Sequence, residues 1–341
     1  MKKFLALMLS LIMVLSLAAC GGTSTDDSAA TDDTATEEPL KIAVLLPSSP
    51  NDGGWGQTGA ESCQYVADTL GGEAAIIEAA TADVMKSEAE ALADDGYKVI
   101  FGHGGQYAAP FAEISADYPD TYFISIGGNI VTENQFPLQS CSEQCAYIQG
   151  VLAAMITETG IVGAINGGDY PSYSKTCIAF EQGAKDTNPD VQVIYTVMNS
   201  DSDPNEAYEV AKAQIAEGAD FIHTNANMAA AGLARACQEA GIKCCLTGTE
   251  MSDFPDYADT MLCSILLPSG AAWLAAVEMC LSGETPDGAI MAGVNEDAVI
   301  WVWNEALQAE LPAEAQTVYD DYIGGILDGS IDIPYESDLY E

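Results

Sequence analysis

Short apolar runs alternate along the chain with longer stretches in which apolar residues recur every three or four positions. The runs are six to eight residues long and rich in Val, Ile and aromatic residues. They predict buried strands, and the stretches between them predict amphipathic helices. Strands that are apolar along their whole length and separated by helices are typical of parallel sheets covered on both faces. The expected strands lie at residues 41–47, 73–79, 97–102, 121–128, 160–167, 191–197, 219–225, 242–248, 261–267 and 298–303.

The sequence SDPNEAYEVAKAQIAEGA predicts both ends of one helix. Asp203 is the expected N-cap, Pro204 the first helical residue and Gly218 the end of the helix. This helix precedes one of the buried strands, as a parallel sheet requires.

The two halves of the chain follow one plan. The segments EALADDGYKVIFGHGGQ and AQIAEGADFIHTNANM align at Gly96 and Gly218, which places His103 opposite Asn225. Each segment reads as an amphipathic helix, a glycine turn, a buried strand and a polar loop. We therefore expect two similar α/β units.

The first 39 residues do not continue this pattern. Residues 1–19 carry two lysines and an apolar stretch that is short for a membrane span, which predicts a secretory signal peptide. The segment LAAC, ending at Cys20, resembles the bacterial lipobox and implies that Cys20 is acylated; a plain signal peptide or a transmembrane anchor is the alternative. Residues 20–39 contain no large apolar residue and three acidic pairs, so we expect a disordered tether.

The rest of the chain is large enough for two domains and is strongly acidic. At 48% hydrophobic residues, about 300 residues exceed what one core usually reaches. The formal net charge of −42 opposes binding of nucleic acid, anionic lipid and phosphorylated metabolites. A neutral or cationic small molecule fits this charge, and selection for solubility explains it equally well.

Nine cysteines follow Cys20, an odd number without a CxxC pair, which argues against zinc or redox chemistry. Several stand inside apolar runs such as IKCCLTG, so we interpret most of them as small core residues. We further hypothesise that the organism lives without oxygen and keeps these thiols reduced.

Polar and aromatic residues gather in the loops that follow the expected strands. Ligands of parallel α/β sheets bind outside the carboxyl ends of the strands, and amides and aromatic rings there suit a neutral, flat or hydroxylated molecule. Trp55 stands out because the loop PSSPNDGGWGQ offers a tryptophan little to pack against. Asn and Asp in such loops also serve as turn or cap residues. The candidates are Asn51, Asp52, Trp55, Gln57, His103, Gln106, Tyr107, Asn129, Asn166, Tyr170, Tyr173, Asn225 and Asn227.

The sequence contains no GxSxG, HExxH or GxxxxGK motif. Of the two histidines, His223 stands inside an apolar run and is expected in the core, while His103 follows a strand and is open to a ligand or turn role. We therefore expect no catalysis, no metal and no cofactor.

Several segments together resemble the basic membrane protein (BMP) family of lipoproteins, which includes purine nucleoside receptors of ABC transporters. They include KIAVLLPSSPNDGGWGQTGAESC, ADDGYKVIFGHGG, YPDTYFISIGGN and ADFIHTNANMAAAGLARACQEAGI. The resemblance implies a type I periplasmic-binding fold, in which two α/β lobes joined by three crossovers close on a ligand. The implied first lobe comprises 40–141 plus 268–283, and the second 142–267 plus 284–341.

In that family the loop after the first strand supplies Asn and Asp for hydroxyl groups and an aromatic ring for the base, which match Asn51, Asp52 and Trp55. The second lobe departs from the pattern, because TGTEMSD stands where the receptors carry GxDxD. This leaves Thr249, Glu250 or Asp253 as candidates. A family lysine is missing from SILLPSG.

The resemblance implies a lipid-anchored protein on the extracytoplasmic face of the cell membrane. It would capture a purine nucleoside or nucleobase and deliver it to the permease subunits of an ABC importer. A sugar receptor of the same fold, or a lipoprotein that senses a ligand and signals to a membrane partner, are the alternatives.

Overall fold

The computed structural model of this chain describes residues 39–52, 55–284, 286 and 288–333. The expected signal peptide, Cys20 and nearly all of the expected tether therefore lie outside the described residues. Residues from Pro39 onward form one unit that contains two six-stranded sheets.

The first sheet has the strand order β11-β5-β4-β3-β1-β2, and all pairs of neighbouring strands in it are parallel. Strand β1 lies between β2 and β3, with Ile42 opposite Ala74 on one side and Val99 on the other. The strands are β1 (Lys41–Leu46), β2 (Glu73–Glu78), β3 (Val99–Gly102), β4 (Tyr122–Ile126), β5 (Gln135–Ser140) and β11 (Ile290–Ala292).

The second sheet has the corresponding order β12-β10-β9-β8-β6-β7. Its pairs are parallel except for β12, which runs antiparallel to β10. The strands are β6 (Ile161–Asn166), β7 (Gln192–Val197), β8 (Phe221–Asn225), β9 (Lys243–Thr247), β10 (Met261–Leu266) and β12 (Ile300–Trp303).

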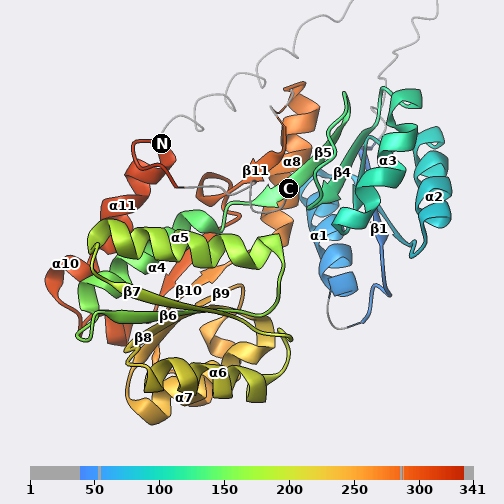
Figure 1. The fold of residues 1–341 in the computed structure, drawn as a ribbon. Helices are drawn as coiled ribbons and strands as arrows, with labels where there is room; N and C mark the ends of the chain where they lie inside the picture. Colours follow the sequence, from blue (N-terminus) through green and yellow to red (C-terminus); the bar gives the residue numbers. More distant parts are fainter. Residues whose placement is uncertain (1–38, 53–54, 285, 287, 334–341) are drawn as a thin grey trace, which may run out of the picture. The chain divides into compact units, whose positions relative to one another are not determined.

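Helices cover both faces of each sheet (Figure 1). Helices α1 and α8 pack on one face of the first sheet, and α2 and α3 on the other; α4, α5 and the C-terminal helices pack on one face of the second sheet, and α6 and α7 on the other. The helices are α1 (Trp55–Leu70), α2 (Ala82–Asp94), α3 (Ala108–Ile114), α4 (Glu143–Ile156), α5 (Pro171–Thr187), α6 (Pro204–Ala216), α7 (Ala230–Ala240), α8 (Ser269–Ser282), α9 (Glu305–Gln308), α10 (Ala313–Gln316) and α11 (Val318–Leu327).

The expected α/β fold with two lobes, each a sheet flanked by helices, is confirmed, and each of the ten expected runs contains a strand. Two strands were not expected, β5 and β11. The all-parallel expectation is wrong at β12, which pairs antiparallel with β10 through Cys263 and Trp303. Strand β11 is bonded to β5 in the first sheet, whereas the division expected from the sequence placed 284–341 with the second lobe.

The repeated plan of the two halves is visible in the identical strand order. Strands β3 and β8 hold the same position, each next to the strand that opens its lobe. Helix α6 begins as expected, since the Asp203 carboxylate accepts a hydrogen bond from the Asn205 N–H at 2.9 Å. Gly218 follows with a φ of +110°, a conformation that favours glycine.

Helices α4 and α5 approach each other unusually closely through two glycines. A Cβ added to Gly150 would lie 1.9 Å from the carbonyl oxygen of Phe180, and one added to Gly183 would lie 2.1 Å from that of Tyr147. The backbones are therefore in contact, and larger side chains at these two positions are excluded. This contact fixes α5 against the start of the second lobe.

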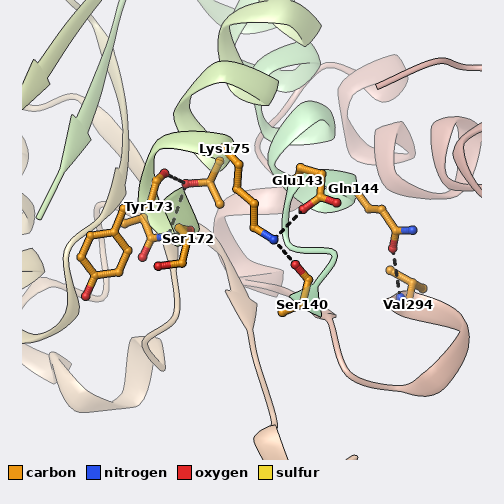
Figure 2. Close-up of polar contacts among 9 residues, drawn as sticks. Ser140, Glu143, Gln144, Ser172, Tyr173, Lys175 and Val294 are labelled. Carbon is orange, nitrogen blue, oxygen red and sulfur yellow. Dashed lines mark hydrogen bonds and ion pairs between the residues drawn. The ribbon is translucent and has the colours of Figure 1, made fainter. Parts of the chain in front are cut away.

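A buried ion pair lies between these two helices at the first crossover, where the chain passes from β5 to α4 (Figure 2). The Lys175 ammonium on α5 lies 3.1 Å from the Glu143 carboxylate at the start of α4 and also donates to the carbonyl of Ser140, the last residue of β5. Gln144 accepts a hydrogen bond from the Val294 N–H at 3.1 Å. This bond joins the first crossover to the third, where the chain passes from β11 to β12. These contacts link the last residue of a first-sheet strand to two second-lobe helices.

The nine cysteines after Cys20 are all buried and free, which agrees with their interpretation as core residues. Burial raises the pKa of the Cys63 and Cys280 thiols to about 12. Within the described part of the chain, none of the helices is both long and apolar enough to span a membrane.

Replacing Gly150 by Ala should lower the free energy of unfolding by about 1–3 kcal/mol or more, because the new methyl group collides with the backbone of α5. Gly324 on α11 is the matched control, since a Cβ there would meet no atom within 4 Å. Gly324→Ala should be neutral or stabilising by up to ~1 kcal/mol. Urea unfolding of both variants measures the difference; equal stabilities would contradict the close contact of α4 with α5.

Candidate ligand-binding site

The loops after β1 and β3 form the candidate site of the first lobe. The two strands are parallel neighbours, so their carboxyl ends lie at the same edge of the sheet, and the His103 N–H donates to the Leu45 carbonyl at 2.9 Å. Trp55, which follows β1, therefore lies against His103, which follows β3.

Asp52 caps the first turn of α1. Its carboxylate accepts hydrogen bonds from the backbone N–H groups of Gly56 and Gln57, both at 3.1 Å, and from the Ser48 hydroxyl at 2.7 Å. An N-cap carboxylate satisfies helix N–H groups that have no partner inside the helix. Gly56 is required here, because a Cβ would lie 2.4 Å from the Ser49 carbonyl oxygen. Asp52 thus makes the cap contact that Asn and Asp residues in such loops commonly make.

Trp55 and His103 are paired by two reciprocal hydrogen bonds and a ring contact. The indole Nε1 of Trp55 donates to the main-chain carbonyl of His103 at 3.0 Å, and His103 Nε2 donates to the main-chain carbonyl of Trp55 at 2.8 Å. The two rings are stacked, with centroids 3.8 Å apart and planes inclined by 18°. Trp55 remains 50% exposed, while His103 is fully buried. One face of the indole is therefore covered by the imidazole.

The imidazole of His103 fits into a space that α1 leaves open. A Cβ on Gly59 would lie 2.6 Å from its ring, so glycine is required at that position. Burial lowers the pKa of His103 to about 4, against smaller opposing effects of the Trp55 carbonyl and the Asp52 charge. The ring is therefore neutral near pH 7, with its proton on Nε2.

The other first-lobe candidates divide between the surface and the core. Asn51, Gln106 and Asn129 are exposed, and Gln57 is half-buried with its amide donating to Glu61 at 2.7 Å. Tyr107 is fully buried and its hydroxyl donates to the Ala79 carbonyl at 2.8 Å. The structure thus places Tyr107 in the core beneath the loop.

The second lobe gathers an aromatic and polar group in the loops after β6, β7 and β8. The Tyr170 ring is 60% exposed and meets Tyr173 edge-on, with centroids 5.8 Å apart. The Tyr173 hydroxyl donates to the Asp201 carboxylate at 2.8 Å. The Asn227 amide donates to the same carboxylate oxygen at 2.8 Å and to the Tyr173 hydroxyl at 2.7 Å. These four side chains form one connected cluster.

Asn166 and Asn225, the last residues of β6 and β8, are both buried. The Asn166 amide lies 2.6 Å from the Tyr195 hydroxyl, and the Asn225 amide donates to the Thr176 hydroxyl at 3.3 Å. Both amides therefore have partners within the second lobe, and Asn225 links the end of β8 to α5.

The TGTEMSD segment forms a capped turn after β9. The Glu250 N–H donates to the Asp253 carboxylate at 3.3 Å, and the Ser252 hydroxyl donates to the Glu250 carboxylate at 2.9 Å. Thr249 is buried, and no hydrogen-bond partner of its hydroxyl lies among the described residues. Both acidic residues thus hold the turn itself.

Comparison with known proteins assigns this architecture. The family model of the PnrA-like substrate-binding proteins of ABC transporters matches residues 40–324. The chain belongs to this family. The resemblance found in the sequence segments is thereby confirmed, and the family is one of solute-binding proteins rather than enzymes.

Relatives of this PnrA-like protein include a purine-binding protein of Brucella abortus (strain 2308), 28% identical over 77% of this chain and 75% of the relative. Basic membrane protein A2 of Borrelia garinii is 21% identical over 88% of this chain and 90% of the relative.

Two solved structures share the fold at low identity. A transcriptional activator of the comK gene from Bacillus halodurans superposes with a TM-score of 0.70 and 20% identity, over 86% of this chain and 99% of that one. An ABC transporter solute-binding protein from Conexibacter woesei gives a TM-score of 0.65 and 19% identity, over 87% of this chain and 99% of that one.

Two residues of this PnrA-like protein were missed at the sequence level, Asp201 and Lys175. Asp201 lies in the loop after β7, and the rule that ligands bind at strand ends pointed to that loop as much as to the others. Lys175 is one of only ten basic residues in the chain and is followed directly by TCIAF, which is apolar except for Thr176. That contrast was a signal for a specific ion pair.

The two buried histidines predict how the stability depends on pH. Burial lowers the pKa of His103 to about 4 and that of His223 to about 3, whereas an unfolded histidine titrates near 6.5. Below pH 6.5 the unfolded chain therefore binds more protons than the native protein. The free energy of unfolding should fall as the pH falls from 6.5 toward 4, by up to ~1.4 kcal/mol per pH unit for each histidine.

Urea unfolding between pH 7.5 and 5.0, where most carboxylates stay ionised, measures this slope. His223→Gln should remove about half of the histidine contribution, since the second histidine no longer titrates. A slope that is the same in the variant would show that the histidines do not control it.

Proposed function

We propose that this protein is the extracytoplasmic solute-binding lipoprotein of an ABC importer and that its ligand is a purine nucleoside or nucleobase. The observation that carries the proposal is the half-exposed indole of Trp55 at the carboxyl edge of the first sheet. One of its faces rests on His103, and the other is available to a flat ring. Stacking of a base on an aromatic side chain contributes ~1–3 kcal/mol.

The polar groups near the strand ends support a neutral ligand. Asp52, Asp201 and Glu250 lie in these loops, and carboxylates accept hydrogen bonds from hydroxyl, amino and ring N–H groups. Together with the net charge of −42, they disfavour phosphorylated ligands. A nucleoside offers hydroxyl and N–H donors without a negative charge.

The comparisons support the same class of ligand. A relative carries the name purine-binding protein at 28% identity, and the matched family is that of PnrA-like substrate-binding proteins. Under this proposal the Tyr170 and Tyr173 rings of the second lobe lie on the opposite side of the ligand from Trp55.

Capture proceeds by closure of the two lobes about the crossovers. Ligand that contacts both lobes stabilises the closed form by the difference between its affinities for the closed and open states. The Lys175–Glu143 pair and the Gln144–Val294 bond hold the crossovers together while the lobes move. Acylated Cys20 and the acidic tether keep the protein at the membrane, where the permease receives the ligand.

A ligand screen tests the proposal. The chain from Pro39 onward, which contains both sheets, is heated with nucleosides, nucleobases and neutral sugars in turn. A ligand at 100 times its dissociation constant adds ~2.7 kcal/mol to the stability. A rise in melting temperature with adenosine, guanosine or inosine supports the proposal. A rise only with sugars would replace it by the sugar-receptor alternative.

Replacing Trp55 by Ala should weaken nucleoside binding by ~1–3 kcal/mol, since the stacking surface is removed. Tyr65→Ala is the matched control, because Tyr65 is an aromatic residue of the same helix with 49% exposure and stands ten positions after Trp55, about 15 Å further along the helix. Calorimetric titration of both variants should separate them. Equal affinities of Trp55→Ala and the unmodified protein would remove Trp55 from the site.

A further inference from the structure

His103 is a fully buried polar residue at the candidate site of the first lobe. Its side chain is fully buried, and no partner of its Nδ1 lies among the described residues. Its Nε2 bonds the main-chain carbonyl of Trp55, and its ring is stacked on the Trp55 indole. A bound molecule therefore cannot reach the imidazole without displacing the indole.

We propose that His103 is the positioning residue of the ligand-stacking ring: it holds the Trp55 indole flat so that a single outer face is presented to the ligand. This proposal rests on the proposed function, in which Trp55 stacks on the ligand. His103 contributes twice, because its side chain bonds the Trp55 backbone and backs the indole, while its main-chain carbonyl accepts the indole N–H.

The support behind the imidazole is rigid. Trp273 on α8 meets the His103 ring edge-on, at a centroid distance of 5.5 Å, and Trp273 itself stacks on Phe101 of β3 at 4.2 Å. Trp273 and Phe101 are both core residues. With Gly59 pressed against the imidazole, a column of four rings connects the exposed indole to the core of the first lobe.

This arrangement determines what Trp55 can recognise. The single N–H donor of the indole is used by the His103 carbonyl, and one ring face is used by the imidazole. The ring therefore offers an apolar π-face and no hydrogen bond. It selects flat ligands by shape, and the hydrogen bonds that distinguish one base from another must come from other residues.

Variants at residue 103 test this role, since they leave the main-chain carbonyl in place. His103→Ala removes both the backing ring and the Nε2 donor. His103→Gln keeps a donor that can reach the Trp55 carbonyl and removes the ring. His223→Gln is the matched control, because His223 is the other buried histidine and lies in the core of the second lobe.

The mobility of Trp55 is measured without ligand by fluorescence anisotropy decay and by acrylamide quenching. The contribution of Trp55 is the part of each signal that is lost when Trp55→Phe is introduced. Affinity for the nucleoside found by the screen is measured in parallel. We expect faster indole motion and stronger quenching in His103→Ala, with binding weakened roughly 2- to 12-fold, as ordering one extra side chain on binding implies. His103→Gln should lie between this variant and the unmodified protein, and His223→Gln should change neither readout.

Unchanged Trp55 mobility in both His103 variants would overturn the proposal, and so would increased mobility with unchanged affinity. If one of the two His103 variants does not fold, the other one decides. Gly59→Ala is a third variant for the same test, since its methyl group displaces the imidazole from the side of α1. If no ring ligand binds the unmodified protein, the proposed function fails, while the mobility measurement still decides whether His103 holds the indole.

Discussion

Both sheets are covered by helices on each face, and this constraint organises the molecule. The strand backbones are shielded from water, so their N–H and C=O groups must pair within the sheet. Polar side chains are confined largely to the strand ends, where the chain leaves the sheet. Because the strands of each sheet are parallel except for β12, their carboxyl ends lie at one edge of that sheet. His103 and Asn225 stand at equivalent ends, the one beneath Trp55 and the other bonded to α5.

The fold was accessible from the sequence because this constraint leaves a clear mark on it. Ten strands appeared as apolar runs, and Asp203 and Pro204 marked a helix start that the structure confirms. Strand β5, with the sequence QFPLQS, escaped notice because two glutamines and Pro137 interrupt its apolar pattern. Strand β11 is only three residues long, and its place is determined by its neighbour β5 rather than by its own sequence. Neither β5 nor β11 therefore has a strand pattern in its own residues.

The candidate site was less accessible, since the role of a loop residue depends on its partners. Trp55 was expected in a loop with little to pack against; it is instead the first residue of α1, half-exposed, with one ring face on His103. The hydrogen bonds that fix it come from His103, 48 positions away, and no periodicity links the two. Asp52 and Tyr107 illustrate the limit in the other direction. A carboxylate before a helix suits a ligand, a cap or both, and a tyrosine after a strand suits a cleft and a core equally. The structure shows Asp52 capping α1 and Tyr107 enclosed in the core.

The nine buried thiols make the exterior of the folded unit chemically quiet toward sulfhydryl reagents. Burial blocks access to all nine, and it also raises the pKa of thiols such as Cys63 and Cys280, which keeps their reactive thiolate rare. A single cysteine engineered into an exposed loop of each lobe would thus accept a fluorescent dye while the native cysteines are left in place. A protein with so many cysteines is therefore well suited to direct optical measurement of the distance between its lobes.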